Sequence, residues 1–324
     1  MTKVPAQKCL SVVVVTWNAK KYVRECLGSL VQQTGDFSIE YIVVDNASTD
    51  GTCDLVRSEF SQVKLICNKR NLGFAAANNI GIREAHGDYL CLINSDVVAP
   101  QDCLDRVFRY MQENPAIGLL GPQMLGPEGT VRRSTMRFPT VWNSFSRALA
   151  VGSAFRRSKL WGGVRMRDFA YDQAMDVDVL NGWFWVVRRE ALDQVGLLDE
   201  RFFIYGEDID WSRRFHLGGW RVVFYPGTSA IHYGGASSAN APIRFYIEMQ
   251  RANIQYWEKH SNPPAKYVYL ASCWLHHILR LLGYATLYGF WAARRDEAAY
   301  KVKRSVAAMF WLGGRRNMRL DGTP

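Results

Sequence analysis

One short acidic segment has the residue types and the position of a cation site. The sequence LINSD at Leu92–Asp96 is an apolar run that ends in Asp96. A carboxylate just past the end of a buried strand can hold a divalent cation through its oxygen atoms. The structural alternative is a cap for a helix that begins near Gln101, but the intervening VVAP segment makes that a poor cap. A functional role for Asp96 is therefore favoured.

A second acidic segment, Tyr205–Arg214, suits proton transfer. It places three carboxylates within four residues, namely Glu207, Asp208 and Asp210. Crowded carboxylates beside aromatic side chains raise one another's pKa, which is what a general base at neutral pH requires. Acidic residues in the first turn of a helix are also favoured by the helix dipole, so a structural role stays open.

Two further polar residues follow strand-like runs. Asp45 ends the run Tyr41–Asp45, and its carboxylate can accept hydrogen bonds from a ribose hydroxyl or a base N–H. The competing interpretation is a capping turn, in which Ser48 or Asp50 opens the next helix. His232 also follows a strand-like run, and for it the alternative is a satisfied histidine of the core.

The segments that must position these residues alternate between short apolar runs and amphipathic stretches of helical length. Buried, largely parallel strands are predicted over Leu10–Thr16, Tyr41–Asp45, Val63–Cys67, Tyr89–Asn94 and Ile117–Gly121. Crossover helices are predicted over Ala19–Gln33, Asp50–Phe60, Phe74–Ala85 and Gln101–Glu113. This pattern predicts an α/β fold with a doubly wound open sheet, which binds ligands at the carboxyl ends of its strands.

The second half of the chain is less regular. Loops and short helices are expected from Glu128 to about Asp176. The later elements are then a strand over Val177–Val187, a helix over Asp208–Leu217, a strand over Trp220–Pro226 and a long helix over Ile243–His260. The sequence Asn-Pro-Pro after residue 261 is expected to stop that long helix.

The positive charge of the chain is concentrated at its carboxyl end. The formal net charge is +10, and from Ala265 onward ten Lys and Arg face three acids, a charge of +7. This asymmetry suggests an anionic partner surface, either lipid headgroups or nucleic acid. The apolar stretch Tyr267–Ala293 is long enough to span a bilayer, but His276, His277 and Arg280 lie in its middle, and a central Arg costs about 3 kcal/mol. We expect helices that lie in the headgroup layer, with packing on the protein's own body or a true span as alternatives.

Composition and cysteine usage narrow the class of protein. Hydrophobic residues make up 48% and charged residues 22%, which excludes a mainly disordered chain. The seven Cys are odd in number and form no Cys-x-x-Cys pair, which predicts free, mostly buried thiols in a reducing compartment. The sequence MTKVPAQK leads directly into a short apolar strand that is too short for a signal peptide.

Six segments occur in one ordered series that carries a family resemblance. They are SVVVVTWN (Ser11–Asn18), VVDNASTDGT (Val43–Thr52), NLGFAAANNIGI (Asn71–Ile82), LINSD (Leu92–Asp96), VLNGWFWVVRREAL (Val179–Leu192) and LDERFFIYGEDIDWSRR (Leu198–Arg214). Together they resemble the family 2 inverting glycosyltransferases, which have the Rossmann-like GT-A fold with a mixed sheet. The subgroup that looks most similar contains the rhamnosyltransferase-type enzymes of bacterial surface-polysaccharide assembly. The resemblance covers about Leu10 to Arg251, and no single motif decides it.

The resemblance implies a nucleotide-sugar pocket at the first strands. Asp45 would contact the nucleotide, with Thr16 and Asn18 lining the same pocket. Asn71 and Gly73 would form the turn beside the base and the ribose.

The resemblance also implies a metal and a base. Asp96 would be the metal-binding acid of the family's D-x-D motif, in which Asn94 here replaces the first acid and leaves fewer anionic ligands for Mg²⁺ or Mn²⁺. His232 would complete the metal site, and Asp208 would be the catalytic base. Arg251 would lie near the diphosphate, although the local Arg-Ala-Asn spacing departs from the Arg-Asn of the subgroup.

On the acceptor side, the resemblance points to Gly182, Trp183 and Glu207. The rings of Trp183, Phe184 and Trp185 can offer an aromatic platform, with packing in the core as the alternative. The implied donor is dTDP-rhamnose, with UDP- or GDP-sugars also possible, and the implied acceptor is a glycan or a polyprenyl-diphosphate-linked glycan. The expected domains are a glycosyltransferase domain over residues 1–260, with a nucleotide-binding half 1–125 and an acceptor half 126–260, and a basic helical tail over 261–324.

Three other classes of protein fit this sequence less well. A non-catalytic scaffold at the membrane is expected to lose its acids, yet Asp45, Asp96 and Asp208 all remain. A nucleotidyltransferase needs a Gly-rich basic loop after the first strand, and Thr16–Ala19 is not one. A nucleic-acid-binding tail fits the apolar stretch less well than lipid does. The sequence therefore predicts a metal-dependent inverting glycosyltransferase that is cytoplasmic and peripherally bound to the inner face of the membrane, with its oligomeric state left open.

Overall fold

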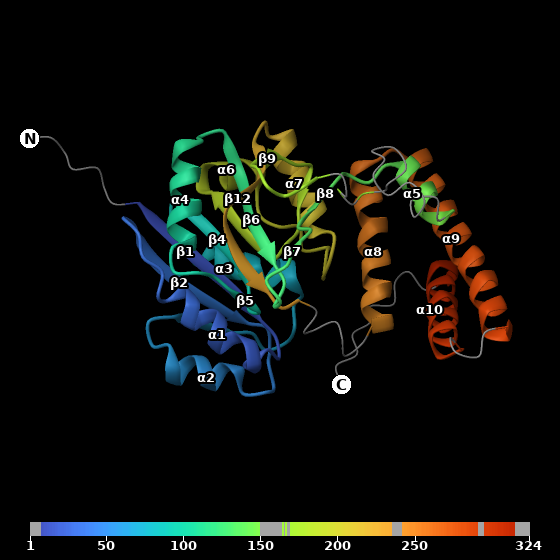
Figure 1. Cartoon of the computed structure of the whole chain (residues 1–324), viewed down its shortest axis with the longest axis horizontal. Coiled ribbons are helices and arrows are strands. Elements are labelled where there is room, and N and C mark those ends of the chain that lie inside the picture. The colour runs from blue at the N-terminus through green and yellow to red at the C-terminus, as the bar shows by residue number, and fades with distance from the viewer. Residues whose placement is uncertain are drawn as a thin grey trace, which may run out of the picture. The chain divides into compact units, whose positions relative to one another are not determined.

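The computed structural model describes residues 8–149, 164, 166, 169–234, 242–290 and 295–314. The chain divides into two compact units, which are described separately. Residues 1–136 and 170–237 form the sheet unit, and residues 137–169 and 238–324 form the helical unit. Figure 1 shows the strands of the first unit and the helices of the second.

The sheet unit contains the doubly wound mixed sheet that the apolar runs predicted. Its parallel part has the order β3-β2-β1-β4, built from β1 (Cys9–Thr16), β2 (Ser38–Asp45), β3 (Lys64–Cys67) and β4 (Tyr89–Asn94). Next to β4 lies β11 (Phe184–Arg188), which runs antiparallel to β4 and to β6 (Ile117–Leu125). The strand β12 (Arg221–His232) is parallel to β6. Short strands complete the described part: β5 (Val97–Val98), β7 (Val131–Arg132), β9 (Met175–Asp176) and the pair β8 (Thr135–Met136) with β10 (Val179–Leu180).

Helices cover both faces of this sheet because alternate residues of each strand point to opposite sides. Val12 and Val14 of β1 belong to a core cluster that includes apolar residues of α1 (Lys20–Leu30), α2 (Thr52–Glu59) and α4 (Cys103–Glu113). Val13 points the other way, toward α3 (Phe74–Arg83), where a Cβ on Gly81 would lie 2.3 Å from Val13 Cγ1. The glycine therefore permits α3 to lie close against the strand.

The register of the parallel strands brings predicted site residues to one edge. Thr16 is paired with Asp45 across β1 and β2, and Val15 is paired with Asn94 across β1 and β4. The chain winds from β1 toward β2 in one direction and reaches β4 on the other side. This reversal is the switch point at which open α/β sheets bind ligands.

Two predicted strands differ from the observed ones. The strand expected over Val177–Val187 is divided into β10 and β11 by a turn, in which the Trp183 N–H donates to the Asn181 carbonyl at 2.9 Å. The strand expected to end at Pro226 continues as β12 because a register shift between Tyr225 and Ser229 accommodates the proline and Gly227. A short helix that the sequence did not predict, α6 (Arg189–Val195), follows β11, and α7 (Glu207–Leu217) carries the acidic segment.

The helical unit corrects the predicted domain boundary at residues 260 and 261. It contains α5 (Val141–Ala148), α8 (Pro242–His260), α9 (Pro263–Phe290) and α10 (Arg295–Gly314). Helix α8 packs against α9 and α10, and α5 packs against α9. The rings of Trp257 on α8 and Tyr269 on α9 stack with centroids 5.2 Å apart. The long helix therefore belongs with the tail because its apolar side chains are buried there, and residues 137–169 join the same unit.

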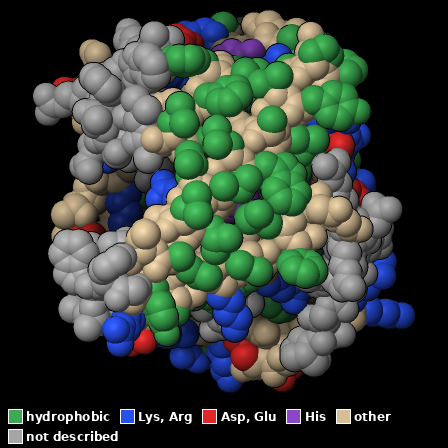
Figure 2. Space-filling view, turned by 90° about the vertical axis from the view of Figure 1, so that its right-hand side faces the viewer, with side chains coloured by type: hydrophobic (Ala, Val, Ile, Leu, Met, Phe, Trp, Pro, Cys, Tyr) green, Lys and Arg blue, Asp and Glu red, His purple; other side chains and the backbone are tan. Residues whose placement is uncertain are grey.

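Helix α9 has two different faces. Tyr269, Leu270 and Cys273 are buried within the helical unit, whereas Leu282 is 61% exposed. On α10, Phe310 is 76% exposed. Figure 2 shows a broad group of apolar side chains on this face, with Lys and Arg side chains beside it. Among the described residues, no helix combines the length and the apolarity that crossing a bilayer requires.

The two units differ strongly in charge. The residues of the helical unit include twenty Lys and Arg and six Asp and Glu, a formal charge of +14. Those of the sheet unit include twenty and twenty-four, a formal charge of −4. The positive charge predicted for the tail therefore belongs to the whole helical unit.

Candidate functional site

The end of β2 holds buried polar atoms that lack protein partners. Asp45 is 1% exposed, and its Oδ2 accepts a hydrogen bond from the Ser48 N–H at 2.8 Å. Asp45 Oδ1 and the neighbouring Thr16 Oγ1 have no hydrogen-bond partner among the described residues. Because buried polar atoms cost free energy unless they are paired, these two atoms are suited to a ligand that brings its own hydrogen-bonding groups.

The sequence left open that the segment after Asp45 is a turn that caps the next helix. In the structure, Asp50 makes side-chain contacts in that turn. Asp50 Oδ1 accepts from the Thr52 N–H at 3.1 Å, and Asp50 Oδ2 accepts from the Lys20 N–H at 2.9 Å. Asn18, with φ of 48°, ties the turn to the end of β1, since its Oδ1 accepts from the Thr49 N–H at 2.8 Å. Asn18 therefore fixes the turn that follows Asp45.

A residue that the sequence did not single out, Asn46, organises the next part of this edge. Its Nδ2 donates to Asn71 Oδ1 at 2.8 Å, and its Oδ1 accepts from the Leu72 N–H at 2.9 Å. Asn71 Oδ1 also accepts from the Gly73 N–H at 2.9 Å. The sequence signal that could have identified Asn46 is its position directly after Asp45, at the end of a predicted strand.

Gly73 holds this turn against the segment that precedes α7. Its φ is +87°, and a Cβ at this position would lie 2.4 Å from the Phe203 carbonyl oxygen. The next residue, Phe74, donates its N–H to the same carbonyl at 2.7 Å. Only glycine permits this approach, because other residues add both a clash and a strained backbone. Gly73, which was predicted to form a turn, therefore also lets that turn contact the segment at Phe203.

Two thiols also lie beside Asp45. One ligand atom each of Asp45, Cys53 and Cys67 lies within 4.8 Å of the others, so this group can hold a metal ion. It is a different group from the metal site predicted at Asp96. All seven cysteines are free, and four of them are buried, which agrees with the sequence prediction.

The predicted metal ligands meet at the end of β4. Asp96 Oδ1 lies 3.2 Å from His232 Nε2, although the two residues are far apart in the sequence. Asn94 Nδ2 lies 3.4 Å from the same ring nitrogen. The antiparallel pairing of His232 with Val97 brings the end of β12 to this place.

Other contacts fix the charge and the orientation of this pair. Burial alone would raise the pKa of Asp96, but its contacts with His232 and with the Gly234 N–H outweigh burial and lower that pKa. The ring of Trp183 stacks on His232 with centroids 5.5 Å apart, and His232 Nδ1 lies 3.2 Å from Met124 Sδ. Asp96 therefore stays ionised at neutral pH, opposite an imidazole held in one orientation.

The acidic segment provides a different kind of carboxylate. Asp208 is partly exposed in the first turn of α7, after Gly206 with φ of 86°. Burial raises the pKa of Asp208 to about 6, and several backbone N–H groups, including that of Gly182, lower it in part. Glu207 is buried, and burial followed by the charge of Asp208 raises its pKa well above the usual value. Asp208 is thus the group that can exchange a proton near neutral pH.

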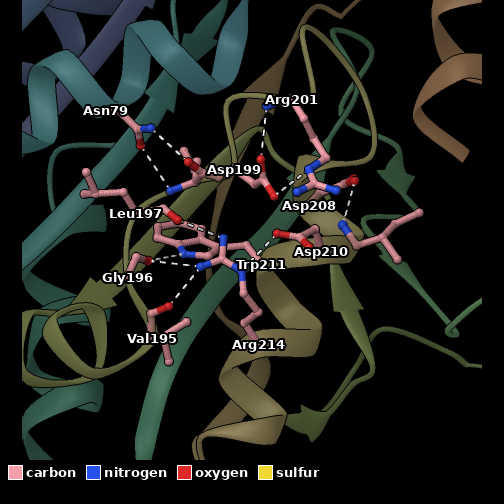
Figure 3. A network of polar contacts seen from close by, with 12 residues as sticks. Asn79, Val195, Gly196, Leu197, Asp199, Arg201, Asp208, Asp210, Trp211 and Arg214 are labelled. Atoms are coloured by element: carbon pink, nitrogen blue, oxygen red, sulfur yellow. Dashed lines mark hydrogen bonds and ion pairs between the residues drawn. The ribbon is translucent and has the colours of Figure 1, made fainter. Parts of the chain in front are cut away.

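Figure 3 shows the network that holds α7 in place. Asp210 is 0% exposed and forms an ion pair with Arg214 at 2.9 Å. Arg214 in turn donates to the carbonyls of Val195 and Leu197 at 2.9 and 2.8 Å. Asp210 therefore has a structural role. The sequence had left that role open as an alternative for the acids in the first turn of this helix.

The segment Gly182–Trp183 connects the two acidic groups. The backbone N–H of Gly182 lowers the pKa of Asp208 in part, and the Trp183 ring stacks on His232, which contacts Asp96. The Trp183 carbonyl also accepts from the Asn94 N–H at 3.0 Å. Gly182 therefore acts on one acidic group, and the next residue, Trp183, contacts the histidine of the other.

Two predicted residues have surroundings that differ from the expected ones. Trp183 is 3% exposed, and Phe184 and Trp185 are buried as well, so no open aromatic platform is present. The core alternative holds for all three rings because β11 lies in the middle of the sheet. Arg251 belongs to α8 of the helical unit, where its guanidinium lies 3.7 Å from Glu248 and over the ring of Trp311. Its role at a diphosphate stays a prediction.

Comparison with known proteins identifies the family. Residues 11–196, more than half of the chain, match the model described as Glycosyl transferase family 2. The chain is a family 2 glycosyltransferase. It is 28% identical over 244 residues to an N-acetylglucosaminyl-diphospho-decaprenol L-rhamnosyltransferase of Mycobacterium tuberculosis, which covers 72% of this chain and 78% of the relative.

Solved structures support the GT-A fold of this glycosyltransferase. A mannosyltransferase of Pyrobaculum calidifontis, solved with GDP-mannose and Mn²⁺, covers 95% of this chain and 88% of its own, with a TM-score of 0.55 and 18% identity. S. aureus TarS in complex with UDP covers 94% and 89%, with a TM-score of 0.51 and 16% identity. At these identities the likeness concerns the fold alone.

The pKa of Asp208 predicts how the activity of the glycosyltransferase depends on pH. A base with a pKa of about 6 is protonated below that value, so kcat/KM should fall about tenfold per pH unit in the acid limb. Above it, the carboxylate is ionised and this limb is flat. Rates of nucleotide diphosphate release, measured together with donor binding over the same pH range, test this. A rate that stays constant through pH 5 would contradict it.

Proposed function

We propose that this glycosyltransferase transfers a sugar, with inversion, from a nucleotide-sugar donor to a hydroxyl group of a lipid-linked glycan. The observation that carries the proposal is that the adjacent residues Gly182 and Trp183 link the two acidic groups, since Gly182 acts on the pKa of Asp208 and Trp183 stacks on the His232 ring that contacts Asp96. One acid has a lowered pKa and suits a cation or diphosphate, and the other has a raised pKa and suits a base. Direct displacement needs these two roles on opposite sides of the sugar.

The donor is the part of the proposal that draws on the relatives. The rhamnosyltransferase relative at 28% identity favours dTDP-rhamnose, and the solved structures with GDP-mannose or UDP mark the alternatives. The unpaired atoms of Thr16 and Asp45 would receive the nucleoside. The turn at Asn71 and Gly73 would lie beside the base and the ribose.

The residues at the end of β4 fit a divalent cation. With Nδ1 facing Met124, His232 presents Nε2 to a carboxylate oxygen of Asp96 at 3.2 Å, and two electron-rich atoms at that distance need a proton or a cation between them. An oxygen and imidazole donor set suits Mn²⁺ and also Mg²⁺, although it includes only one carboxylate. Asp96 and His232 would hold the ion, which would neutralise the charge that develops on the leaving diphosphate.

The acceptor hydroxyl would lose its proton to Asp208. Asp208 is partly exposed, whereas Glu207 is buried and its pKa is raised well above the usual value. The backbone N–H of Gly182 lowers the pKa of Asp208 in part, and a Cβ at Gly182 would lie 3.6 Å from Glu207 Oε1. Gly182 and Glu207 therefore shape the acceptor side, and the name of the relative makes a polyprenyl-diphosphate-linked glycan the acceptor we favour.

Replacing the proposed base tests this function. Asp208→Asn should lower kcat by about 10²–10⁴-fold, because the amide cannot take the proton, while nucleotide binding persists. The measurement is nucleotide diphosphate release with acceptor present, together with calorimetric binding of the nucleotide. Asp193→Asn, an exposed acid on α6, is the matched control and should retain activity. Full activity in Asp208→Asn would remove Asp208 from this role.

The cation site is tested by its metal requirement. His232→Gln should raise the Mn²⁺ concentration needed for half-maximal nucleotide diphosphate binding by about tenfold or more, since one ligand is weakened. Calorimetry at a series of Mn²⁺ and Mg²⁺ concentrations measures this without relying on turnover. His86→Gln, which changes an exposed histidine, is the control. An unchanged Mn²⁺ dependence would argue against His232 as a ligand.

The helical unit is proposed to bind the inner face of the cell membrane peripherally. Its exposed apolar side chains on α9 include Val268, Ile278, Leu279 and Leu282, which recur with helical spacing. The unit also carries a formal charge of +14. An apolar face beside Lys and Arg is the pattern of helices that lie in the headgroup layer of anionic lipid.

Charges placed on this face should weaken membrane binding. Leu282→Asp or Phe310→Asp should lower the affinity for phosphatidylglycerol vesicles by about tenfold, the effect of losing one buried apolar side chain. Co-sedimentation at low and high salt measures this. Leu217→Asp, on a leucine of the sheet unit that is 74% exposed, is the matched control. An equal effect of all three substitutions would show that only net charge matters.

A further inference from the structure

A histidine is buried inside the helical unit without a hydrogen bond. His277 on α9 is 1% exposed, and neither of its ring nitrogens has a partner among the described residues. A neutral imidazole has one donor and one acceptor, and buried polar groups in proteins are nearly always satisfied. Nothing in the donor site or at the proposed base accounts for this residue, because it lies in the other unit.

The ring of Tyr246 lies edge-on to the ring of His277 with centroids 6.0 Å apart, and the charged groups that act on the pKa of His277 are arginines. After burial, the charges of Arg147, Arg304 and Arg280 lower the pKa of His277 to about 4. These residues come from α5, α10 and α9, so the tertiary packing of the helical unit assembles them. Three arginines from three helices thus act on one buried imidazole.

The partners of these arginines are neutral. Arg304 lies over the Tyr246 ring at 4.4 Å, and Arg280 donates to the Tyr284 hydroxyl at 3.1 Å. The groups that act on Arg147 are hydroxyl and thiol groups rather than carboxylates. Within the described residues, none of the three arginines has an ion pair with an acid. The cluster therefore has positive charge without a counter-ion.

The surroundings indicate what kind of anion fits. Arg147 is exposed, so the cluster is open to solvent on that side. On α9, the next residues after His277 are Ile278 and Leu279, which are exposed apolar side chains. Guanidinium groups match phosphate oxygens in geometry and charge. An anion that carries an apolar chain would use both features.

We infer that His277, Arg147, Arg280 and Arg304 form a binding site for the diphosphate group of a lipid. This inference rests on the proposed function in one respect, since a lipid-linked diphosphate glycan is the acceptor proposed above. It adds the residues that recognise the diphosphate, and it places them in the helical unit. The oxyanion could equally come from free diphosphate or from lipid headgroups, so the experiment separates these sources.

The experiment measures binding of farnesyl diphosphate to the full chain. EDTA is present so that the cation-dependent donor site does not contribute. Arg304→Gln should weaken binding by about tenfold or more, the effect of losing one charge-assisted hydrogen bond. Lys303→Gln, an exposed neighbour on α10 with the same change of charge, should leave binding within about twofold. Equal effects of the two substitutions would overturn the site.

A second variant separates binding from folding. His277→Phe keeps a buried ring but removes the unpaired nitrogens, so Tm should be unchanged or higher while farnesyl diphosphate binding weakens. A histidine with a purely structural role would show the reverse, with a lower Tm and unchanged binding. Circular dichroism and calorimetry on the same samples give both values.

Competing anions identify the source of the diphosphate. Inorganic diphosphate should displace farnesyl diphosphate, but only at higher concentration, because it lacks the apolar chain. Vesicles of phosphatidylglycerol that displace the probe as well as inorganic diphosphate does would overturn the assignment to a diphosphate. Asp208→Asn should leave this binding unchanged, so a failure of the proposed catalytic function and a failure of this site give different results.

Discussion

The parallel register of β1, β2 and β4 is the constraint on which the site depends. It places Thr16 beside Asp45 and Val15 beside Asn94, so the polar residues that end three separate strands meet at one edge. Parallel strands leave their carboxyl ends on the same side, and the buried valines between them prevent a slip of one residue. The positions of Thr16, Asp45 and Asn94, which the proposal assigns to the nucleotide and the cation, are therefore set by strand pairing rather than by loop structure.

The antiparallel strand β11 connects this edge of the sheet to the acidic segment that contains Asp208. It lies between β4 and β6, and the turn before it brings Gly182 to Asp208 and Trp183 to His232. The two acids that the reaction needs therefore differ because their surroundings differ. Asp96 faces an imidazole and a backbone N–H, whereas Asp208 lies in a buried setting beside Glu207. Opposite pKa shifts follow from that contrast.

The helical unit differs from the sheet unit in charge and in exposed apolar surface. Its formal charge of +14 and its exposed apolar side chains suit an anionic lipid surface, and within the described residues the three arginines that act on His277 form no ion pair with an acid. Several cations near one another repel, and an anion that joins them offsets this repulsion. That cost explains why a cluster such as the one around His277 points to a ligand.

The sequence by itself determined the parallel strands, the acids at their ends, the ordered motifs and the positive charge, because each is a local pattern of residues. It also placed Asp96 and His232 in one site, through a family resemblance. Only the tertiary structure decided that Trp183 is buried against His232, that Asn46 organises the turn, that α8 belongs with the tail, and that three arginines surround His277. These features depend on contacts between residues that are distant in the chain, and such contacts leave no periodicity or spacing in the sequence.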